Sequence, residues 1–524
     1  MTTEFDVVVI GAGPAGENAA GRCADGGLSV AIVERELVGG ECSYWGCIPS
    51  KTLIRPGDAL AATRRVPGAA AAVTGAVDVT AALAWRDRMT SGWNDEGQLP
   101  WLESKGVELI RGRGRLAGER TVEVEQADGS PLRLVARRAV VIATGTLAAI
   151  PPIPGLADLD PWDNRDVTAA KQIPRRLLVI GGGAIGCEMA QAFRRLGAAQ
   201  VTLVESLDRL IPQEEPFAGQ ELRQAFEAEG ITVVTGVKMT GARRDGGDGP
   251  VVATLENGRE LTGDEILVSA GRRPATSDLG LEHAGLEPGQ SIDVNDQLRV
   301  PGLDWLYAVG DCNGRALLTH MGKYQARLAG DAILGRDVTD IAVTPRVTFT
   351  DPQVSAVGST EAEARERSPD VTVVSHPTGD VAGASTLGDG ITGTSQLVID
   401  DAPRVIVGAT FTGPGTAELL HPATIAIVGQ VTTDRLWHAT PSLPPQRGLA
   451  PPHGNLRPVT PSDRLIRRRG LGEQAAALVE LAGLGQIRIV ALQHGVQRKR
   501  PGARRVDQPL GGQRLVTKRA PLVR

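Results

Sequence analysis

Cysteine is scarce in this chain, which has only five among its 524 residues, at positions 23, 42, 47, 187 and 312. Such few and scattered cysteines exclude the disulfide-dense scaffold of small secreted proteins. The amino terminus is acidic and leads straight into an apolar run, which does not fit a secretory signal. No uninterrupted apolar stretch is long enough to cross a bilayer, so no membrane partner is expected. These absences predict a cytoplasmic protein in which any disulfide is catalytic.

Aromatic residues make up only 3% of the chain, and residues 445–524 contain none. That segment holds 16 Lys+Arg and 4 Asp+Glu, a balance of +12, whereas residues 1–444 have a balance of -17. The acidic body and the basic tail therefore need separate explanations. Without an aromatic platform or a recognised fold, the tail gives little reason to expect nucleic-acid binding, and disorder is the favoured prediction.

A first nucleotide-binding unit opens the chain. The β-rich run at residues 5–10 is followed by a glycine turn, a helical segment and a strand that ends in Glu34. This order is typical of a dinucleotide-binding unit. Gly11 permits the tight turn, Gly13 lets the backbone approach a pyrophosphate, and Gly16 lets the helix pack against the strand. The helix N-terminus then faces the phosphates, and Glu34 is placed to accept hydrogen bonds from an adenosine ribose.

A second unit of the same design follows a predicted strand over residues 176–180. Its turn contains three glycines, which are Gly181, Gly183 and Gly186. The repeat predicts either two dinucleotides or two related domains. Its second strand ends in Glu205, and a terminal glutamate favours a free 2′-hydroxyl and repels a 2′-phosphate. NADH is therefore the preferred cofactor. Because Arg209 lies nearby in the sequence, NADPH stays an alternative.

Between the two units, Cys42 and Cys47 lie five positions apart at the start of a predicted helix. Pro49 suits the first turn of that helix, where its missing N–H costs nothing. The helix N-terminus favours a thiolate at Cys47, and Lys51 on the same face adds a cation. Two buried, inert cysteines are the plain alternative. The surrounding glycines, proline and lysine favour instead a redox pair that opens and closes.

Several further motifs occur in order, and they are Ala143-Thr144-Gly145, Glu188, Ala270-Gly271-Arg272-Arg273-Pro274 and Tyr307-Ala308-Val309-Gly310-Asp311. With them, the chain resembles the FAD-dependent pyridine nucleotide-disulfide oxidoreductases, the family of dihydrolipoyl dehydrogenase, glutathione reductase and mercuric reductase. The resemblance covers about the first 440 residues. It implies an α/β fold with two Rossmann-like domains, one binding FAD and one binding NAD, and an α+β dimerisation domain.

The resemblance also implies where the cofactors bind. FAD would lie on the first unit and NAD(P)H on the second. Thr144 and Gly145 would line the adenosine side of FAD, and Asp311 would hydrogen-bond its ribityl chain. Gly271 belongs to the same cofactor-binding set, and a helix starting at Thr319 would lie beside the flavin. No metal site is expected.

The redox chemistry is implied in the same way. Cys47 would be the thiol against the flavin, and Cys42 would be the interchange thiol that meets the substrate. Lys51 would lie by the flavin N5 and pair with Glu188. Electrons would pass from the nicotinamide through flavin and disulfide to a small disulfide, or in reverse from a dithiol. A quinone or diaphorase-type reductase that bypasses the disulfide is the second hypothesis. Mercuric reduction is disfavoured, because no cysteine follows Cys312.

A chain of this length exceeds one hydrophobic core, so two to four domains are expected. The resemblance places them at 1–150 and 276–340 for the two parts of the FAD-binding domain, 151–275 for the NAD(P)H-binding domain, 341–444 for the interface domain and 445–524 for the tail. An intact interface domain would make a homodimer.

The chain departs from the family near its interface domain. Many members have a His-Pro whose histidine acts as acid and base on the partner's disulfide, but here Leu443 precedes the proline. His438, five residues earlier, is a candidate substitute, and a structural role for it is the alternative. The missing His-Pro supports the quinone hypothesis.

The tail has a second explanation, in which the reading frame shifts after Pro444. Codons that fit residues 445–454 can spell, one base out of phase, a Ser-Glu followed by a helix, as the family has there. The last eighty residues would then be out of frame, and the protein would be a truncated, weakly active family member.

Overall fold

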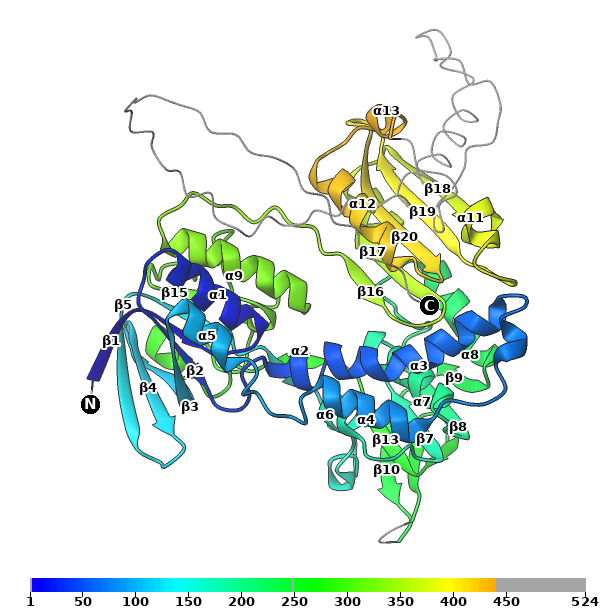
Figure 1. The fold of residues 1–524 in the computed structure, drawn as a ribbon, viewed down its shortest axis with the longest axis horizontal. Helices are drawn as coiled ribbons and strands as arrows, with labels where there is room; N and C mark the ends of the chain where they lie inside the picture. Colours follow the sequence, from blue (N-terminus) through cyan, green and yellow to red (C-terminus); the bar gives the residue numbers. More distant parts are fainter. Residues whose placement is uncertain (1, 247–248, 440–524) are drawn as a thin grey trace, which may run out of the picture. The chain divides into compact units, whose positions relative to one another are not determined.

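The first sheet of the protein has six strands (Figure 1). The structure is a computed structural model that describes residues 2–246 and 249–439. The strands are β1 (Thr2–Ile10), β2 (Val30–Glu34), β3 (Val107–Gly118), β4 (Thr121–Gln126), β5 (Pro131–Ile142) and β15 (Leu306–Ala308). Parallel pairing gives the order β3-β2-β1-β5-β15. Strand β4 pairs antiparallel with the second half of β3 and with the beginning of β5.

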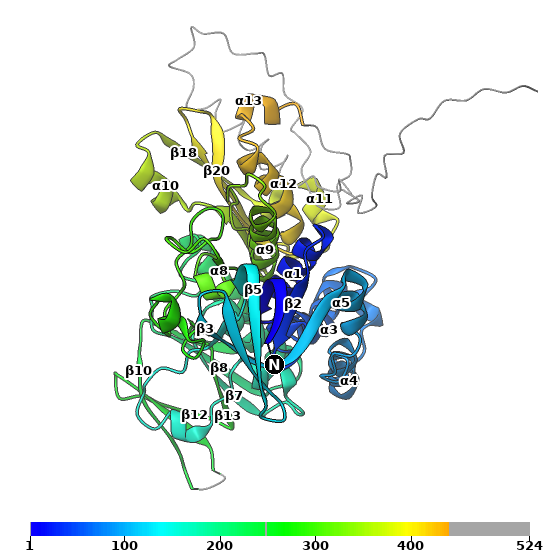
Figure 2. The same cartoon turned by 90° about the vertical axis from the view of Figure 1, so that its left-hand side faces the viewer.

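Both faces of this sheet are covered, which explains why β1 is a continuous apolar run. On one face, α1 (Pro14–Asp25) and α9 (Thr319–Ile333) pack together over Val7 and Val9 (Figures 1 and 2). The alanines of both helices make that close approach possible. On the other face, Val8 and Ile10 pack with residues of the 279–306 segment. The carboxyl ends of β1 and β2 therefore meet the start of α1 at one edge.

A second parallel sheet runs in the order β13-β7-β8-β9. Its strands are β7 (Arg176–Ile180), β8 (Gln200–Glu205), β9 (Ile231–Thr235) and β13 (Glu265–Val268). Helices α7 (Ala184–Arg195) and α8 (Pro216–Ala228) pack on one face through Phe193 and Phe226. A three-stranded antiparallel sheet packs on the other face, with strands β10 (Met239–Arg244), β11 (Val251–Leu255) and β12 (Glu260–Gly263).

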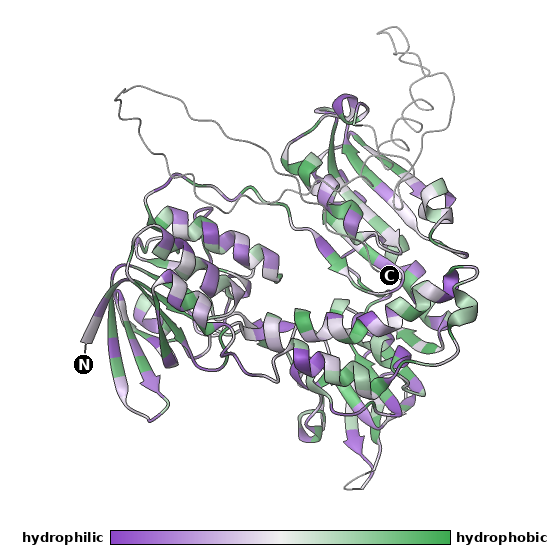
Figure 3. Cartoon of the chain, in the orientation of Figure 1, coloured by the Kyte–Doolittle hydropathy of each residue, from purple (hydrophilic) through white to green (hydrophobic). Residues whose placement is uncertain are grey.

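The third sheet is entirely antiparallel and has the order β16-β17-β20-β19-β18. Its strands are β16 (Arg346–Thr348), β17 (Gln353–Gly358), β18 (Val371–Pro377), β19 (Thr394–Asp400) and β20 (Val405–Gly413). Helix α12 (Ala417–Val428) closes a core around Leu397, Phe411 and Leu420. This unit is bordered by three shorter helices, α10 (Glu361–Arg367), α11 (Ala382–Ser385) and α13 (Thr433–Leu436). Figure 3 shows apolar residues concentrated in the strands of the sheets.

The remaining elements connect the sheets. They are the helices α2 (Gly40–Tyr44), α3 (Cys47–Arg65), α4 (Val79–Met89), α5 (Leu99–Lys105) and α6 (Asn164–Ala169), and the ribbon of β6 (Thr146–Ala148) with β14 (Arg272–Pro274). Helix α3 starts at Cys47 and packs against α7, so it joins the two Rossmann-like units. This contact sets the geometry of the candidate site.

The predicted fold class is confirmed, with two Rossmann-like units and an α+β unit. The predictions for residues 445–524 lie outside the described residues. The exact domain boundaries stay a prediction. Among the residues that the structure describes, no helix has the length and apolarity needed to cross a membrane.

Candidate functional site

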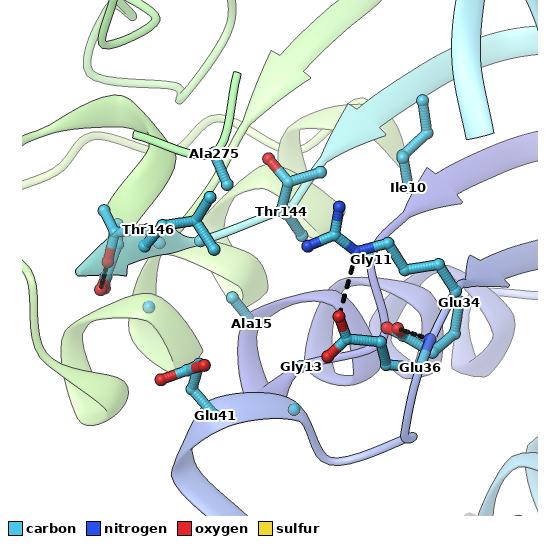
Figure 4. Close-up of a pocket in the computed structure, with 18 of the residues that line it drawn as sticks. Ile10, Gly11, Gly13, Ala15, Glu34, Glu36, Glu41, Thr144, Thr146 and Ala275 are labelled. Atoms are coloured by element: carbon cyan, nitrogen blue, oxygen red, sulfur yellow. Dashed lines mark hydrogen bonds and ion pairs between the residues drawn. The ribbon is translucent and has the colours of Figure 1, made fainter. Parts of the chain in front are cut away.

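The first glycine turn lines a cleft of about 360 Å³ (Figure 4). Gly11 has φ +100°, and a Cβ there would lie 2.6 Å from the carbonyl oxygen of Ala143. A Cβ on Gly16 would lie 1.8 Å from the carbonyl oxygen of Gly11. Only glycine at this position lets α1 approach the turn so closely. Gly13 has nothing within 4 Å on the side of its missing side chain, and it lines the cleft. The turn therefore has the room that a pyrophosphate needs.

Glu34 fastens this turn to the end of β2. Its Oε2 accepts a 2.7 Å hydrogen bond from the N–H of Ala12, and its Oε1 accepts one of 2.7 Å from the N–H of Glu36. Burial raises the pKa of Glu34, against the two backbone donors that lower it. The carboxyl group still lines the cleft, where a ribose can reach it.

Further lining of the cleft comes from the loops after β5 and β15. The buried Oγ1 of Thr144 has no hydrogen-bond partner in the described part of the chain, as expected of a polar atom that a ligand satisfies. Gly145 follows with φ +70°. Asp311 accepts a 2.9 Å hydrogen bond from Thr146 Oγ1, and burial raises its pKa. These groups and the open glycine turn fit a dinucleotide such as FAD.

The second glycine turn repeats the geometry of the first. Gly181 has φ +106°, and a Cβ there would lie 2.5 Å from the carbonyl oxygen of Ser269. A Cβ on Gly186 would lie 2.0 Å from the carbonyl oxygen of Gly181, whereas Gly183 is open. The turn can therefore take a second pyrophosphate.

Glu205 anchors the second glycine turn in the way that Glu34 anchors the first. Its Oε2 accepts a 2.6 Å hydrogen bond from the N–H of Gly182, and its Oε1 accepts one of 2.8 Å from the N–H of Leu207. Arg209 donates to the carbonyl oxygen of Pro212 at 2.8 Å. The carboxylate is thus fixed at the end of β8, whereas the buried Nε of Arg209 has no hydrogen-bond partner in the described part of the chain.

The two cysteines lie on consecutive helices, Cys42 in the middle of α2 and Cys47 as the first residue of α3. Both are free thiols, so the structure shows the dithiol state. A hydrogen bond from Cys42, a contact of 3.4 Å to Thr319 Oγ1 and the charge of Lys51 lower the pKa of Cys47 to about 6, against burial. The hydrogen bond to Cys47, together with burial, raises the pKa of Cys42. The electrostatics therefore assign the thiolate to Cys47.

Lys51 and Glu188 form an ion pair between α3 and α7, with 2.6 Å from Nζ to Oε2. The Glu188 side chain is only 6% exposed and that of Lys51 38%. The other carboxylate oxygen accepts a 2.9 Å hydrogen bond from the N–H of Phe349, whose ring centroid lies 4.8 Å from the Lys51 Nζ. The pair holds a cation one helical turn from Cys47.

The backbone between the cysteines is held by side chains from outside the loop. The Tyr44 carbonyl accepts a 3.2 Å hydrogen bond from Trp93 Nε1. The Trp45 carbonyl accepts from Asn164 Nδ2 at 3.1 Å and from Thr168 Oγ1 at 3.3 Å. These bonds fix the backbone of the loop between the two cysteines.

The structure brings seven of the seventeen predicted site residues to one cleft, and the second glycine turn with Glu205 is not among the residues that line it. This cleft is lined by Gly11, Gly13, Glu34, Cys42, Thr144, Gly145 and Asp311. Gly271, with φ +130°, precedes β14, whose Arg272 lines the same cleft. The other three cysteines are buried, as expected of structural residues. His438 is exposed after α13, and the described part of the chain provides no hydrogen bond or ion pair to its imidazole. Leu443 and Pro444 lie outside the described residues.

Sequence reasoning missed Thr319 and Phe349 as parts of the redox site. For Thr319 a signal existed, since a helix starting there was expected beside the flavin. Nothing local marked Phe349, which follows β16 in the third unit. Within residues 2–246 and 249–439, no group of His, Cys, Asp and Glu side chains is arranged to hold a metal ion.

Comparisons with known proteins agree with this geometry. The family model described as pyridine nucleotide-disulphide oxidoreductase matches residues 5–327, and the dimerisation-domain model of that name matches residues 344–448. The chain is 34% identical over 440 residues to a dihydrolipoyl dehydrogenase from Thermus scotoductus, covering 82% of this chain and 92% of that protein. It is 30% identical over 441 residues to a mercuric reductase from Staphylococcus aureus, covering 83% and 79%.

Two solved structures show the same fold. LpdA from Mycobacterium tuberculosis aligns with a TM-score of 0.75 at 27% identity, covering 84% of this chain and 96% of that chain. The HOCl-induced flavoprotein disulfide reductase RclA from Escherichia coli aligns with a TM-score of 0.73 at 24% identity, covering 84% and 97%.

Proposed function

Because the chain belongs to the pyridine nucleotide-disulphide oxidoreductase family, whose members use FAD and NAD(P)H, we propose that it passes electrons from NADH through Cys42 and Cys47 to a small disulfide. The opposite direction, oxidation of a dithiol, uses the same groups. The observation that carries the proposal is the placement of the two thiols. Cys42 lines the cleft. Cys47 begins α3, one helical turn before the Lys51–Glu188 ion pair and 3.4 Å from Thr319 Oγ1, a setting that favours its thiolate.

The first unit would hold FAD. Gly13 leaves space for its pyrophosphate, Glu34 faces its ribose, and Thr144 offers an unsatisfied hydroxyl. Asp311, in the loop after β15, would take the ribityl chain. Bound FAD supplies the chemistry that the side chains lack, since it accepts a hydride and can hand an electron pair to a disulfide.

The two cysteines carry the thiol chemistry. Near neutral pH the dithiol holds one proton, on Cys42, which is hydrogen-bonded to the Cys47 thiolate. As the sulfur of Cys42 attacks one sulfur of the substrate disulfide, its proton passes, directly or by way of Cys47, to the departing substrate thiolate, which leaves Cys47 ionised. The Cys47 thiolate then attacks the sulfur of Cys42, and the second substrate thiolate leaves and takes a proton from solvent. The products are two substrate thiols and the Cys42–Cys47 disulfide, so two electrons and two protons have moved.

The second unit would hold the nicotinamide cofactor, and Glu205 supports NADH over NADPH. Its carboxylate oxygens are fixed by two backbone N–H groups at the end of β8. A 2′-phosphate would meet this charge, and one terminal nitrogen of Arg209 is bonded to a carbonyl, while its buried Nε has no partner within the described residues. The free 2′-hydroxyl of NADH can donate to the carboxylate.

We further propose a homodimer located in the cytoplasm. The chain carries the dimerisation domain of the family, and α12 on that domain leaves Ile425 and Val428 each 44% exposed. Exposed apolar side chains on an ordered helix suit a protein–protein contact. His438 remains the candidate for the acid–base role. The candidate substrates are a small disulfide, a dithiol and a quinone.

A Cys42→Ser variant tests the proposal against the quinone alternative. If electrons leave through Cys42, the variant should lose turnover with lipoamide and with low-molecular-weight disulfides by several orders of magnitude. A quinone acceptor serves as the internal comparison on the same preparation. Full disulfide turnover by Cys42→Ser would contradict the proposal, and quinone turnover exceeding every disulfide in the wild type would favour the alternative. Mercuric ion belongs in the same panel, because a similar protein is a mercuric reductase.

A further inference from the structure

The segment that begins the dimerisation domain is clamped between α3 and α7. Glu188, Gln191 and Arg195 lie on one face of α7, at spacings of three and four residues. All three contact residues 349–351. The far end of α3 contributes Arg65, which pairs with the carboxylate of Asp351.

Gln191 holds this segment by its backbone. Its Oε1 accepts a 2.7 Å hydrogen bond from the N–H of Asp351, and its Nε2 donates to the carbonyl oxygen of the same residue at 2.9 Å. Arg195 adds a 2.8 Å ion pair to the Asp351 side chain. Gln191 is 3% exposed and Asp351 9%, so these bonds form away from water. The backbone two residues before Asp351 therefore has little freedom.

Phe349 occupies that fixed position, and both its backbone N–H and its aromatic ring contact the ion pair. Its N–H satisfies the Glu188 oxygen that Lys51 does not take, at 2.9 Å. Its ring presents a face to the Lys51 ammonium, with the centroid 4.8 Å from Nζ. A cation within about 6 Å of a ring centroid is attracted by the ring quadrupole, more strongly as water is excluded.

We propose that Phe349 is a positioning residue, through which the dimerisation domain of the same subunit holds the Lys51–Glu188 pair beside the redox cysteines. The inference deepens the proposed function and rests on it, since the pair matters because it faces the Cys47 thiolate. No local signal in the sequence predicts this dependence, because the segment is 161 residues from Glu188.

The effect should be visible at Cys47. The groups that face this thiol are Cys42 from α2, Lys51 from α3, Glu188 from α7 and Thr319 from α9. Lys51 stabilises the thiolate and Glu188 opposes it, with the lysine making the larger contribution. Without the Phe349 ring, more water reaches the pair and Lys51, which is already 38% exposed, gains freedom, so the net stabilisation of the thiolate falls.

The test compares Phe349→Leu with a matched control in a Cys42→Ser background, where Cys47 is the remaining active-site thiol. Leucine keeps the backbone N–H and an apolar side chain but removes the aromatic face. Two absorbances are followed against pH in the FAD-loaded protein, the ultraviolet thiolate band and the long-wavelength thiolate-to-flavin band. The pKa of Cys47 should rise by about half a unit, so that the thiolate-to-thiol ratio falls about threefold at a given pH.

Phe411→Leu is the control, because it makes the same change in the core of the same domain, away from Lys51. It should lower thermal stability without moving the titration. Phe349→Tyr keeps the ring and should restore the background curve. If Phe349→Leu does not fold, Gln191→Met tests the inference in its place. This variant removes both hydrogen bonds to Asp351 and should shift the titration curve of Cys47 in the same direction.

An unchanged curve for Phe349→Leu, or for Gln191→Met where that variant decides, overturns the inference, as does an equal shift in Phe411→Leu. Failure of the proposed function gives a different result. The long-wavelength band is then missing at every pH in all variants, while the ultraviolet band still reports the pKa of Cys47.

Discussion

Replacing Lys51 by methionine should raise the pKa of the Cys47 thiol, because it removes a cation one helical turn away and leaves the buried Glu188 carboxylate behind. Residues four apart on a helix have Cβ atoms about 6 Å apart. At about 6 Å, two unit charges interact by about 0.7 kcal/mol in water and about 2.8 kcal/mol at an effective dielectric constant of about 20. Lys51 is 38% exposed, so the effect lies between these limits. The expected rise is about 0.5 to 2 pKa units.

The consequence is a large change in the thiolate population at neutral pH. A rise of about 1.5 pKa units lowers the thiolate-to-thiol ratio of Cys47 about thirtyfold at a given pH. The stability contributed by this thiolate is present at pH above the unfolded pKa of cysteine and is lost as pH falls through the folded pKa, because the folded value is the lower one.

The assay is the pH titration of the thiolate absorbance in a Cys42→Ser background, with and without Lys51→Met. The background is needed because the hydrogen bond from Cys42 is itself the main cause of the low pKa of Cys47. Lys51→Arg keeps the charge and is the matched control, with a curve close to the background. A Lys51→Met curve that overlays the background curve would refute the assignment of Lys51 as the cation that stabilises the thiolate.

Four further substitutions test other parts of the site. Glu205→Gln removes the charge but keeps a hydrogen-bonding side chain, so the ratio of kcat/KM for NADH over NADPH should fall about tenfold, or about 1.4 kcal/mol; an unchanged ratio contradicts the role of Glu205. Thr319→Val removes a hydroxyl 3.4 Å from the Cys47 sulfur and should raise the pKa of that thiol by about half a unit in the same titration, whereas no shift would exclude the contact. Gly13→Ala should fold with a near-normal Tm but retain little FAD, while Gly16→Ala should unfold or melt far lower, because its Cβ would lie 1.8 Å from a backbone oxygen; equal behaviour of the two in melting and flavin content would contradict the different roles of these glycines.

The nucleotide-binding units could be predicted well because each is a local pattern. Glu34 ends β2 and Glu205 ends β8, where the strand-to-loop transition was expected. The tight packing at Gly16 and Gly186 also follows from sequence, since only glycine tolerates such an approach. In these stretches the residues that decide the geometry lie within one strand, turn and helix.

The support around the cysteines could not be predicted in the same way. Thr319 reaches Cys47 across 272 residues, and Phe349 reaches Glu188 across 161. Such contacts depend on how separate sheets pack, which no local periodicity encodes. The sequence placed Lys51 on the same helical face as Cys47, and the structure adds which buried groups hold that cation.

Anaerobic titration of the FAD-loaded protein with NADH tests the central claim most directly. Two-electron reduction should open the Cys42–Cys47 disulfide and give a long-wavelength band from the Cys47 thiolate against oxidised flavin, before the flavin itself is bleached. Direct bleaching of the flavin at the first equivalent of NADH, without such a band at any stage, would contradict the account.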